Sequence, residues 1–375
     1  MSRFLLSCGG TGGHLSPGIS LAEGLIARGH EVILLISQKK VDARQVEKYP
    51  HLDFRKMPGA GFSWSPMGAA RFALRQYQAL SFCLDLIQDW KPDVIVGFGG
   101  FTSTPAALAG RIRRIPVALH ESNRVPGLAI RTLGRLAKRV YLPVGIEIAG
   151  VSPECRRHAG LPVRREIVRR ETEDARRDLG LDPNAKVLAI LGGSQGATAL
   201  NTWVRAHAAY FASEGIQVYC VTGLGKGEAE VIESKSKAGA TVKSFFVPFT
   251  DRVADILSAA DLVVSRAGAG TLAELVRCET PAILIPYPHA ASDHQRANAA
   301  FFEQQGGGFV VEQAAMIGLQ AEVMDAIFDD WLLRKFRANL RRMDRANHLD
   351  LMLRDLEGMA RPGSGDYPET AAITA

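Results

Sequence analysis

The sequence predicts an α/β protein made of two doubly wound, Rossmann-like domains that face each other across a cleft. Four apolar runs of strand length end in a glycine-rich turn and lead into a stretch of helical periodicity. These turns are at residues 9–13, 97–100, 192–196 and 268–270. Residues 94–102 resemble residues 262–271, so the second half repeats a feature of the first. A chain of 375 residues is long enough for two such domains, each with its own core.

Composition favours a globular protein from a reducing compartment. Hydrophobic residues make up 47% of the chain and charged residues 22%, which is typical of a folded protein. The five cysteines are scattered singly, so neither a disulfide framework nor a paired zinc site is expected. The N-terminal residues lack the apolar core of a signal peptide, and no apolar run reaches the roughly 20 residues that cross a bilayer. We therefore expect a cytoplasmic protein, and attachment to a membrane surface stays open.

Positive charge is concentrated in the first half of the chain. Residues 1–165 contain 23 Lys and Arg against 11 Asp and Glu, a net charge of +12, whereas the remainder has a net charge of −6. Such a split suggests that the first half faces an anionic partner, which could be nucleic acid, acidic lipid or a phosphorylated substrate. The alternative is a solvated basic surface without a partner.

The first domain begins with a strand at residues 3–7, a glycine turn and a helix at residues 17–28. The turn departs from the dinucleotide-binding fingerprint, because Leu15 stands where the third glycine would be. The next strand, residues 32–36, has no acidic residue at its end to hold a ribose. A nicotinamide cofactor is therefore disfavoured.

A long helix is predicted over residues 67–90, with more apolar side chains than one core-facing stripe requires. It is either a mostly buried helix or one that partly reaches a membrane surface, with Arg71 and Arg75 beside it. A buried strand at residues 93–96 follows, and the dipeptide Thr104-Pro105 is expected to start the next helix.

Charged residues dominate between Gly145 and Asp182, and we place the domain boundary in this stretch. The predicted division is a first domain at 1–160, a second at 161–330, a C-terminal helix at 331–360 that could pack back on the first domain, and a disordered tail at 361–375.

The second domain offers two turns suited to phosphate groups. Backbone N–H groups at a glycine turn and a helix N-terminus attract oxyanions, and residues 192–196 and 267–271 each provide them. Thr271 is expected to open the second of these helices. Glu274 then has two interpretations, as the partner of Thr271 in a capping box or as an acceptor for ribose hydroxyls.

Polar side chains near the cleft also keep two interpretations. Gln295 and Asn298 could bind sugar hydroxyls or anchor their loop. His14 could act as a general base or serve as an ordinary residue of a helix N-terminus. Glu121, next to His120, could orient such a base or cap a turn. No cluster of metal ligands stands out, so a divalent metal is not expected to carry the leaving group.

Taken together, these motifs resemble the MurG family of glycosyltransferases. The resemblance rests on residues 9–14, 97–101, 119–123, 192–197, 265–274 and 281–298, which follow the family's order. It implies the GT-B architecture, with the acceptor bound mainly by the first domain and a UDP-sugar by the second. It further implies transfer of N-acetylglucosamine (GlcNAc) from UDP-GlcNAc to undecaprenyl-diphosphate-linked muramyl-pentapeptide in peptidoglycan synthesis, without a cofactor or a metal.

The resemblance also assigns roles to residues. His14 would be the catalytic base with Thr11 and Glu121 nearby. Ser194 and its neighbours would hold the diphosphate, Glu274 the ribose and the loop at Phe249 and Thr250 the uracil. Gln295 and Asn123 would contact GlcNAc. The full set of implied substrate-binding residues is Gly12, Gly13, Asn123, Arg164, Gly193, Ser194, Gln195, Phe249, Thr250, Gly268, Ala269, Thr271, Glu274, Gln295 and Asn298.

The chain departs from the family pattern at two positions. Leu161 stands where many members have Asn, and Ser122 stands where Gln is common. The implied partners are the two substrates, an anionic membrane surface and other proteins of cell-wall synthesis, rather than nucleic acid, with a peripheral location on the cytoplasmic face of the membrane. Two other functions stay open: a UDP-sugar transferase acting on diacylglycerol or another lipid, and a UDP-sugar-binding protein without activity.

Overall fold

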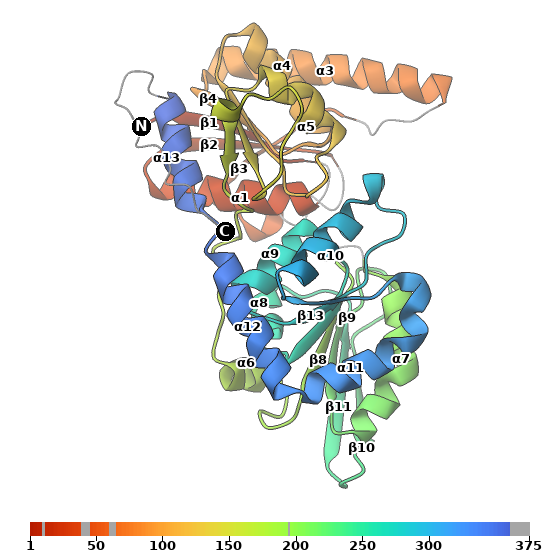
Figure 1. Cartoon of the computed structure of the whole chain (residues 1–375). Helices are drawn as coiled ribbons and strands as arrows, with labels where there is room; N and C mark the ends of the chain where they lie inside the picture. The colour runs from red at the N-terminus through yellow and green to blue at the C-terminus, as the bar shows by residue number, and fades with distance from the viewer. Residues whose placement is uncertain (10–11, 39–45, 60–64, 194–195, 361–375) are drawn as a thin grey trace.

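The computed structural model describes residues 1–9, 12–38, 46–59, 65–193 and 196–360, so the predicted tail lies outside the described residues. Two seven-stranded sheets form the centres of two domains, one above the other in Figure 1. We call these the first and the second domain. The strands of the first sheet are β1 (Arg3–Ser7), β2 (Glu31–Ile36), β3 (Asp53–Lys56), β4 (Val94–Gly97), β5 (Val117–His120), β6 (Arg139–Leu142) and β7 (Arg156–His158).

The first sheet is parallel and doubly wound, as the sequence predicted. Its strand order is β3-β2-β1-β4-β5-β6-β7, and the winding reverses between β1 and β4, where Leu5 pairs with Ile95. Because the strands are parallel, the turns after β1 and β4 meet at one edge of the sheet. This edge, at the point where the winding reverses, is where such folds bind ligands.

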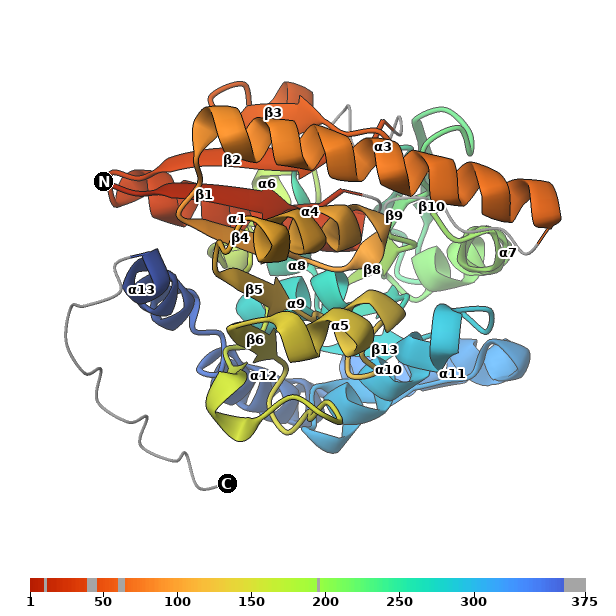
Figure 2. The same ribbon diagram turned by 90° about the horizontal axis from the view of Figure 1, so that it is seen from above.

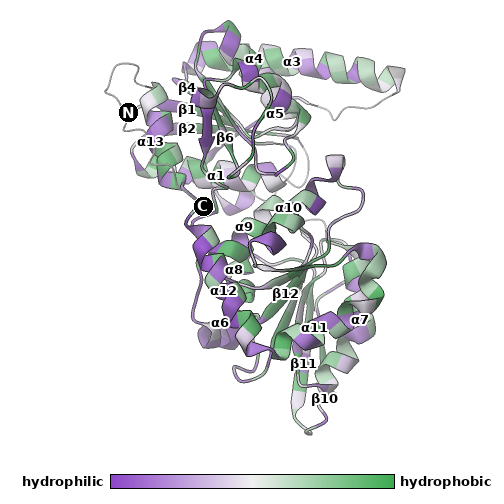
Figure 3. Cartoon of the chain, viewed as in Figure 1, coloured by the Kyte–Doolittle hydropathy of each residue, from purple (hydrophilic) through white to green (hydrophobic). Residues whose placement is uncertain are grey.

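Helices cover both faces of the first sheet. Alternate residues of β1 point to opposite faces, so Phe4 and Leu6 join the core under α1, while Leu5 joins the core under α3 and α4. Figure 3 shows the strands as mostly hydrophobic inside these layers. The helical segments of this domain are α1 (Gly12–Ala27), α3 (Pro66–Trp90), α4 (Gly100–Ile112), α5 (Leu128–Leu133), η1 (Gly134–Leu136) and η2 (Pro153–Cys155).

The second sheet repeats this winding, with the order β10-β11-β9-β8-β12-β13-β14 and the reversal between β8 and β12. Only the edge pair β10 and β11 is antiparallel, and it forms a hairpin at the end of the domain away from the first domain (Figure 1). The strands are β8 (Val187–Leu191), β9 (Gln217–Val221), β10 (Glu230–Lys235), β11 (Thr241–Val247), β12 (Leu262–Ser265), β13 (Ala282–Leu284) and β14 (Gly308–Val310).

The helices of the second domain also form two layers. The core on one face includes residues of α6, α8 and α9, and the core on the other includes residues of α7 and α11. The helical segments are α6 (Thr172–Asp178), α7 (Thr198–Ser213), α8 (Val253–Ala259), α9 (Ala269–Arg277), η3 (Ala291–Asp293), α10 (His294–Gln304), η4 (Gln313–Gly318), α11 (Leu319–Phe328) and α12 (Asp330–Asp344).

The C-terminal segment forms two helices where the sequence predicted one over 331–360. After α12 the chain turns and crosses to the first domain, where α13 (Leu349–Ala360) lies against α1 (Figures 1 and 2). Met352 and Leu356 are buried in the core under α1. Asp355 accepts hydrogen bonds from Tyr141 Oη at 2.8 Å and Arg139 Nε at 3.1 Å. These contacts hold α13 on the first domain.

Two helices of the first domain begin earlier than predicted. Helix α1 begins at Gly12, before Pro17, and α4 begins at Gly100, before Thr104 and Pro105. The interior Pro105 is tolerated because Gln76 Nε2 donates to the Phe101 carbonyl at 3.1 Å, which replaces the N–H that proline lacks.

Candidate active site between the two domains

His14 lies on the first turn of α1, just beyond the glycine turn after β1. Its imidazole packs against the turn after β4, because a Cβ atom added at Gly99 or Gly100 would lie 3.5 Å or 3.2 Å from the ring. Both glycines have positive φ angles, 91° and 71°, which a side chain would disfavour. Gly99 and Gly100, which lie more than 80 residues away in the sequence, therefore make room for His14. Of its predicted neighbours, Gly12 and Gly13 begin the helix, and Thr11 lies outside the described residues.

His120 is fully buried near His14 and has a structural role. Burial lowers the pKa of His120 to about 4, and the nearby charge of His14 lowers it further, against the opposing effect of the Gly160 carbonyl. Its Nε2 lies 3.0 Å from this carbonyl oxygen. A neutral ring with its proton on Nε2 satisfies this bond, so His120 connects β5 to the segment between the domains.

Glu121 shapes the loop that follows β5. Its Oε1 accepts from Asn123 N at 2.8 Å and Asn123 Nδ2 at 3.2 Å, and its Oε2 accepts from Gly127 N at 2.7 Å. Burial raises the pKa of this carboxyl group, and the hydrogen bonds partly oppose the rise. These contacts correspond to the turn-capping interpretation of Glu121, and they fix the position of Asn123.

Asn298 connects this loop to the second domain. Its Oδ1 accepts from Arg124 N at 3.0 Å, and its Nδ2 donates to Asn123 Oδ1 at 3.1 Å and to Ala267 O at 3.2 Å. The Arg124 guanidinium also lies over the Phe301 ring, 3.7 Å from its centre. Asn298 is buried and makes the contacts of an anchor, one of the two roles that the sequence left open.

The turn after β8 forms a backbone site suited to phosphate. Gly193 and Gly196 have positive φ angles, and Gly196 N donates to Gly193 O at 2.9 Å. A Cβ atom at Gly196 would lie 2.1 Å from Thr222 O, so only glycine fits there. The N-terminus of α7 follows with no side-chain cap. Ser194 and Gln195, at the centre of this motif, lie outside the described residues.

Lys226 lies at this turn and was missed by the sequence analysis. Its Nζ donates to Thr198 Oγ1, on the first residue of α7, at 3.0 Å. A cation at a helix N-terminus adds to the positive dipole end and suits a diphosphate. The residues 223–227, Gly-Leu-Gly-Lys-Gly, form a second glycine-rich turn after a strand, and this pattern could have revealed Lys226.

The turn after β12 differs from the prediction in its helix start. Helix α9 begins at Ala269 with Gly268 as its N-cap, so Thr271 lies inside the first turn and does not cap it. Glu274 makes no capping-box contact. Its Oε1 accepts from Arg164 Nη2 at 2.9 Å, and the side chains are only 15% and 11% exposed. Glycine is also a favoured residue at the N-cap, and no side chain caps this helix start.

The loop before α10 is held by side chains of the second domain. Arg266 is buried beneath it and donates to the carbonyls of Ile285 and Pro286 at 3.1 and 3.2 Å. Gln295 Oε1 accepts from Tyr287 N at 2.9 Å. On the loop after β11, Thr250 Oγ1 accepts from Arg252 N at 3.0 Å, and Phe249 is partly exposed.

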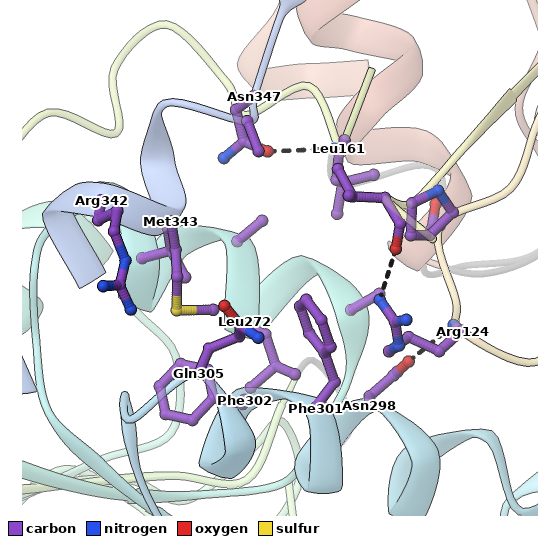
Figure 4. Close-up of a pocket in the computed structure, with 18 residues that line it drawn as sticks. Arg124, Leu161, Leu272, Asn298, Phe301, Phe302, Gln305, Arg342, Met343 and Asn347 are labelled. Carbon is purple, nitrogen blue, oxygen red and sulfur yellow. Dashed lines mark hydrogen bonds between the residues drawn. The ribbon is translucent and has the colours of Figure 1, made fainter. Parts of the chain in front are cut away.

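A cavity of about 260 Å³ lies between the domains beside Asn298 (Figure 4). Leu272, Phe301, Phe302 and Met343 form much of its apolar wall, and Arg124 lies at its edge. Of the predicted substrate-binding residues that the structure describes, only Ala269 and Asn298 line it. Since α1 packs against α9, the helix that bears His14 and the helix that bears Glu274 lie next to each other.

Neither a metal site nor a membrane span is present in the described part of the chain. Its His, Cys, Asp and Glu residues form no group of three or more that could hold a metal ion. None of its helices is both long and apolar enough to cross a membrane.

Comparison with known proteins identifies the family. Residues 4–142 match the glycosyltransferase family 28 N-terminal domain, and residues 187–338 match the C-terminal domain of the same family. The chain is 61% identical over 372 residues, 99% of each chain, to the UDP-N-acetylglucosamine--N-acetylmuramyl-(pentapeptide) pyrophosphoryl-undecaprenol N-acetylglucosamine transferase of Opitutus terrae. The chain belongs to the MurG family. A MurG-family transferase of the same name from Desulforudis audaxviator is 34% identical over 96% of this chain and all of its own.

Solved structures support the fold. The crystal structure of Acinetobacter baumannii MurG has a TM-score of 0.71 at 23% identity and covers 95% of this chain and 99% of its own. The calicheamicin glycosyltransferase CalG4 has a TM-score of 0.68 at 15% identity and covers 97% of this chain and 100% of its own. The predicted GT-B architecture of the MurG family is thus confirmed, with its two domains facing one site.

Proposed function

We propose that this chain transfers GlcNAc from UDP-GlcNAc to the 4-hydroxyl of undecaprenyl-diphosphate-linked N-acetylmuramyl-pentapeptide. The full-length identity to the Opitutus terrae transferase carries this proposal. The acceptor oxygen attacks the anomeric carbon, the bond from that carbon to the diphosphate oxygen breaks, and UDP leaves. Attack opposite the leaving group inverts the configuration.

His14 is the proposed base that receives the proton of the acceptor hydroxyl. Its support is its position on the first turn of α1, beside the turn after β4 and on the helix that packs against α9. Asn123 is held by Glu121 and Asn298 and would contact GlcNAc together with Gln295. Glu121 thus contributes by positioning, since both of its oxygens already accept hydrogen bonds from the loop.

The second domain would hold UDP by its backbone turns and a few side chains. The turn at Gly193 and Gly196, the N-terminus of α7 and Lys226 would stabilise the charge that develops on the diphosphate. Glu274 would accept from the ribose hydroxyls, and the loop at Phe249 and Thr250 would hold uracil. This donor set supplies positive charge from the protein itself, so we propose transfer without a metal; turnover that EDTA abolishes and Mg²⁺ restores would contradict it.

Release of UDP from UDP-GlcNAc, measured with different acceptors, tests the function. We expect release with the muramyl-pentapeptide lipid and none with diacylglycerol or without acceptor. Release with diacylglycerol alone would favour the lipid transferase, and UDP-GlcNAc binding without release would favour a binding protein.

The chain would work at the cytoplasmic face of the membrane as a peripheral protein. Helix α3 supports this location, because its N-terminal end extends beyond the rest of the first domain (Figure 1). Met67, Leu74 and Tyr77 are exposed on it, and Arg71 and Arg75 lie between them. Apolar side chains interleaved with arginines suit the surface of an anionic bilayer.

A further inference from the structure

A cluster of charged and polar side chains connects the first domain to Glu274. Arg164, on the segment between the domains, donates to Glu274 with Nη2 at 2.9 Å, while its Nη1 lies 3.5 Å from Tyr49 Oη and 3.5 Å from Glu166 Oε1. Tyr49 Oη donates to the same Glu166 oxygen, which also accepts from Lys48 Nζ at 3.1 Å. Tyr49 is therefore connected to the proposed ribose carboxylate through Arg164, both directly and by way of Glu166.

Within this cluster Tyr49 is buried and the side chains of Arg164 and Glu274 are nearly so, whereas Glu166 is exposed. Tyr49 is 4% exposed, and its burial, with the bond to Glu166, raises the pKa of its hydroxyl group, so the hydroxyl stays protonated and donates. Burial by itself lowers the pKa of Arg164. The neighbouring Glu274, Tyr49 and Glu166 outweigh this effect, so the pKa of Arg164 is raised. Charged groups shielded from water hold one another far more firmly than exposed pairs do.

One donor of Arg164 is left unpaired in this arrangement. Within the described residues, its buried Nε has no hydrogen-bond partner, and buried donors are rarely left unpaired in a complete site. Lys48 Nζ also lies 3.5 Å from Asp251 Oδ1, next to Thr250 on the proposed uracil loop. Lys48 and Tyr49, two neighbouring residues of the first domain, thus lie near the nucleotide site proposed for the second domain.

We infer that Tyr49 is a positioning residue of the donor site, which orients Glu274 toward the ribose through Glu166 and Arg164. Tyr49 and Glu166 together hold Nη1 of Arg164, while Nη2 of the same side chain binds Glu274. Without the Tyr49 hydroxyl, or without the charge of Glu166, Arg164 loses this support and the Glu274 carboxylate loses its fixed orientation. The inference rests on the proposed role of Glu274 as the ribose contact. Its consequence is that the first domain takes part in nucleotide recognition as well as in acceptor binding.

Tyr49→Phe tests this in the full-length protein, with UDP and 2′-deoxy-UDP as calorimetric probes. The variant loses a hydrogen bond to a charged carboxylate, so we expect it to bind UDP roughly tenfold more weakly. Binding of 2′-deoxy-UDP should change less, because one of the hydroxyls that Glu274 holds is absent. The preference for UDP over 2′-deoxy-UDP should therefore be smaller in the variant than in the wild type. In turnover, the KM for UDP-GlcNAc should rise while kcat and the acceptor KM stay within about twofold.

Two further variants separate positioning from folding. Glu166→Gln keeps the shape of the side chain and should also reduce the preference for UDP, while Tyr210→Phe, an exposed tyrosine on α7, should leave it unchanged. An unchanged preference in both Tyr49→Phe and Glu166→Gln would overturn the inference. Equal binding of the two probes by the wild type would instead overturn the assignment of Glu274 to the ribose.

Discussion

His14 lies at the N-terminus of α1, beside Gly99 and Gly100. Its proposed role as the catalytic base predicts the effect of removing its side chain. His14→Ala should retain UDP affinity, because the proposed UDP contacts lie in the second domain, and should lose turnover by about 100-fold or more. Steady-state UDP release and calorimetry measure the two quantities. His51→Ala, an exposed histidine of the same domain, is the matched control. Turnover within a few fold of the wild type would remove His14 from this role.

His120 gives an expectation for stability against pH. Its pKa is about 4 in the folded protein and 6.5 ordinarily, so the unfolded chain takes up this proton first as the pH falls below about 6.5. The folded state then loses stability until about pH 4, by up to about 3 kcal/mol for this shift. His120→Gln, which stays neutral, should flatten this part of the profile, measured by urea unfolding from pH 7 to pH 4. The exposed His51→Gln should leave the profile as it is, and an equally steep profile for His120→Gln would contradict the assignment.

Helix α3 is the element that we expect to bind the membrane surface. Each basic residue near an anionic surface contributes about 1 kcal/mol, so Arg71→Glu with Arg75→Glu should weaken binding to phosphatidylglycerol vesicles at least roughly tenfold. Sedimentation with vesicles at low and high salt measures this. The control pair Arg334→Glu and Lys335→Glu, on the exposed face of α12, changes the net charge equally. Equal losses for both pairs would show a general effect of charge instead of a surface on α3.

The apolar pattern of α13 does not determine where in the molecule this helix packs. The sequence predicted one helix over 331–360 that could pack on the first domain, and α13 has the buried apolar face that is typical of a helix packed on a core. The face alone does not say which core receives it. Leu353 packs against Gly24 of α1, and Asp355 accepts from Tyr141 and Arg139, so the partners are residues of the first domain that lie more than 200 positions earlier in the sequence.

The whole molecule depends on the contact between the domains at Asn298. Asn298→Ala would remove its bonds to Asn123, Arg124 and Ala267, and unpaired buried groups cost about 1–3 kcal/mol each. We expect the domains to separate more often, kcat to fall about tenfold or more, and UDP affinity to change little. Energy transfer between labels on the two domains measures the separation. Asn339→Ala, which loses a bond to Gly306 within the second domain, is the control, and an unchanged separation would refute the expectation.

The sequence by itself determined the two doubly wound sheets, the glycine turns at their edges and the family to which the motifs belong. Strand-length apolar runs and glycines act over a few residues, so their consequences can be deduced locally. Only the tertiary structure decided the neighbours of each polar side chain: Glu274 with Arg164, Glu121 with Asn123 and Gly127, and Asn298 with the loop of the other domain. Spacing could not choose between a cap and a ligand for Glu274, or between an anchor and a sugar contact for Asn298. The partners that distinguish these roles, Arg164 for Glu274 and Asn123 for Asn298, lie more than 100 residues away in the sequence and come close only in the folded chain.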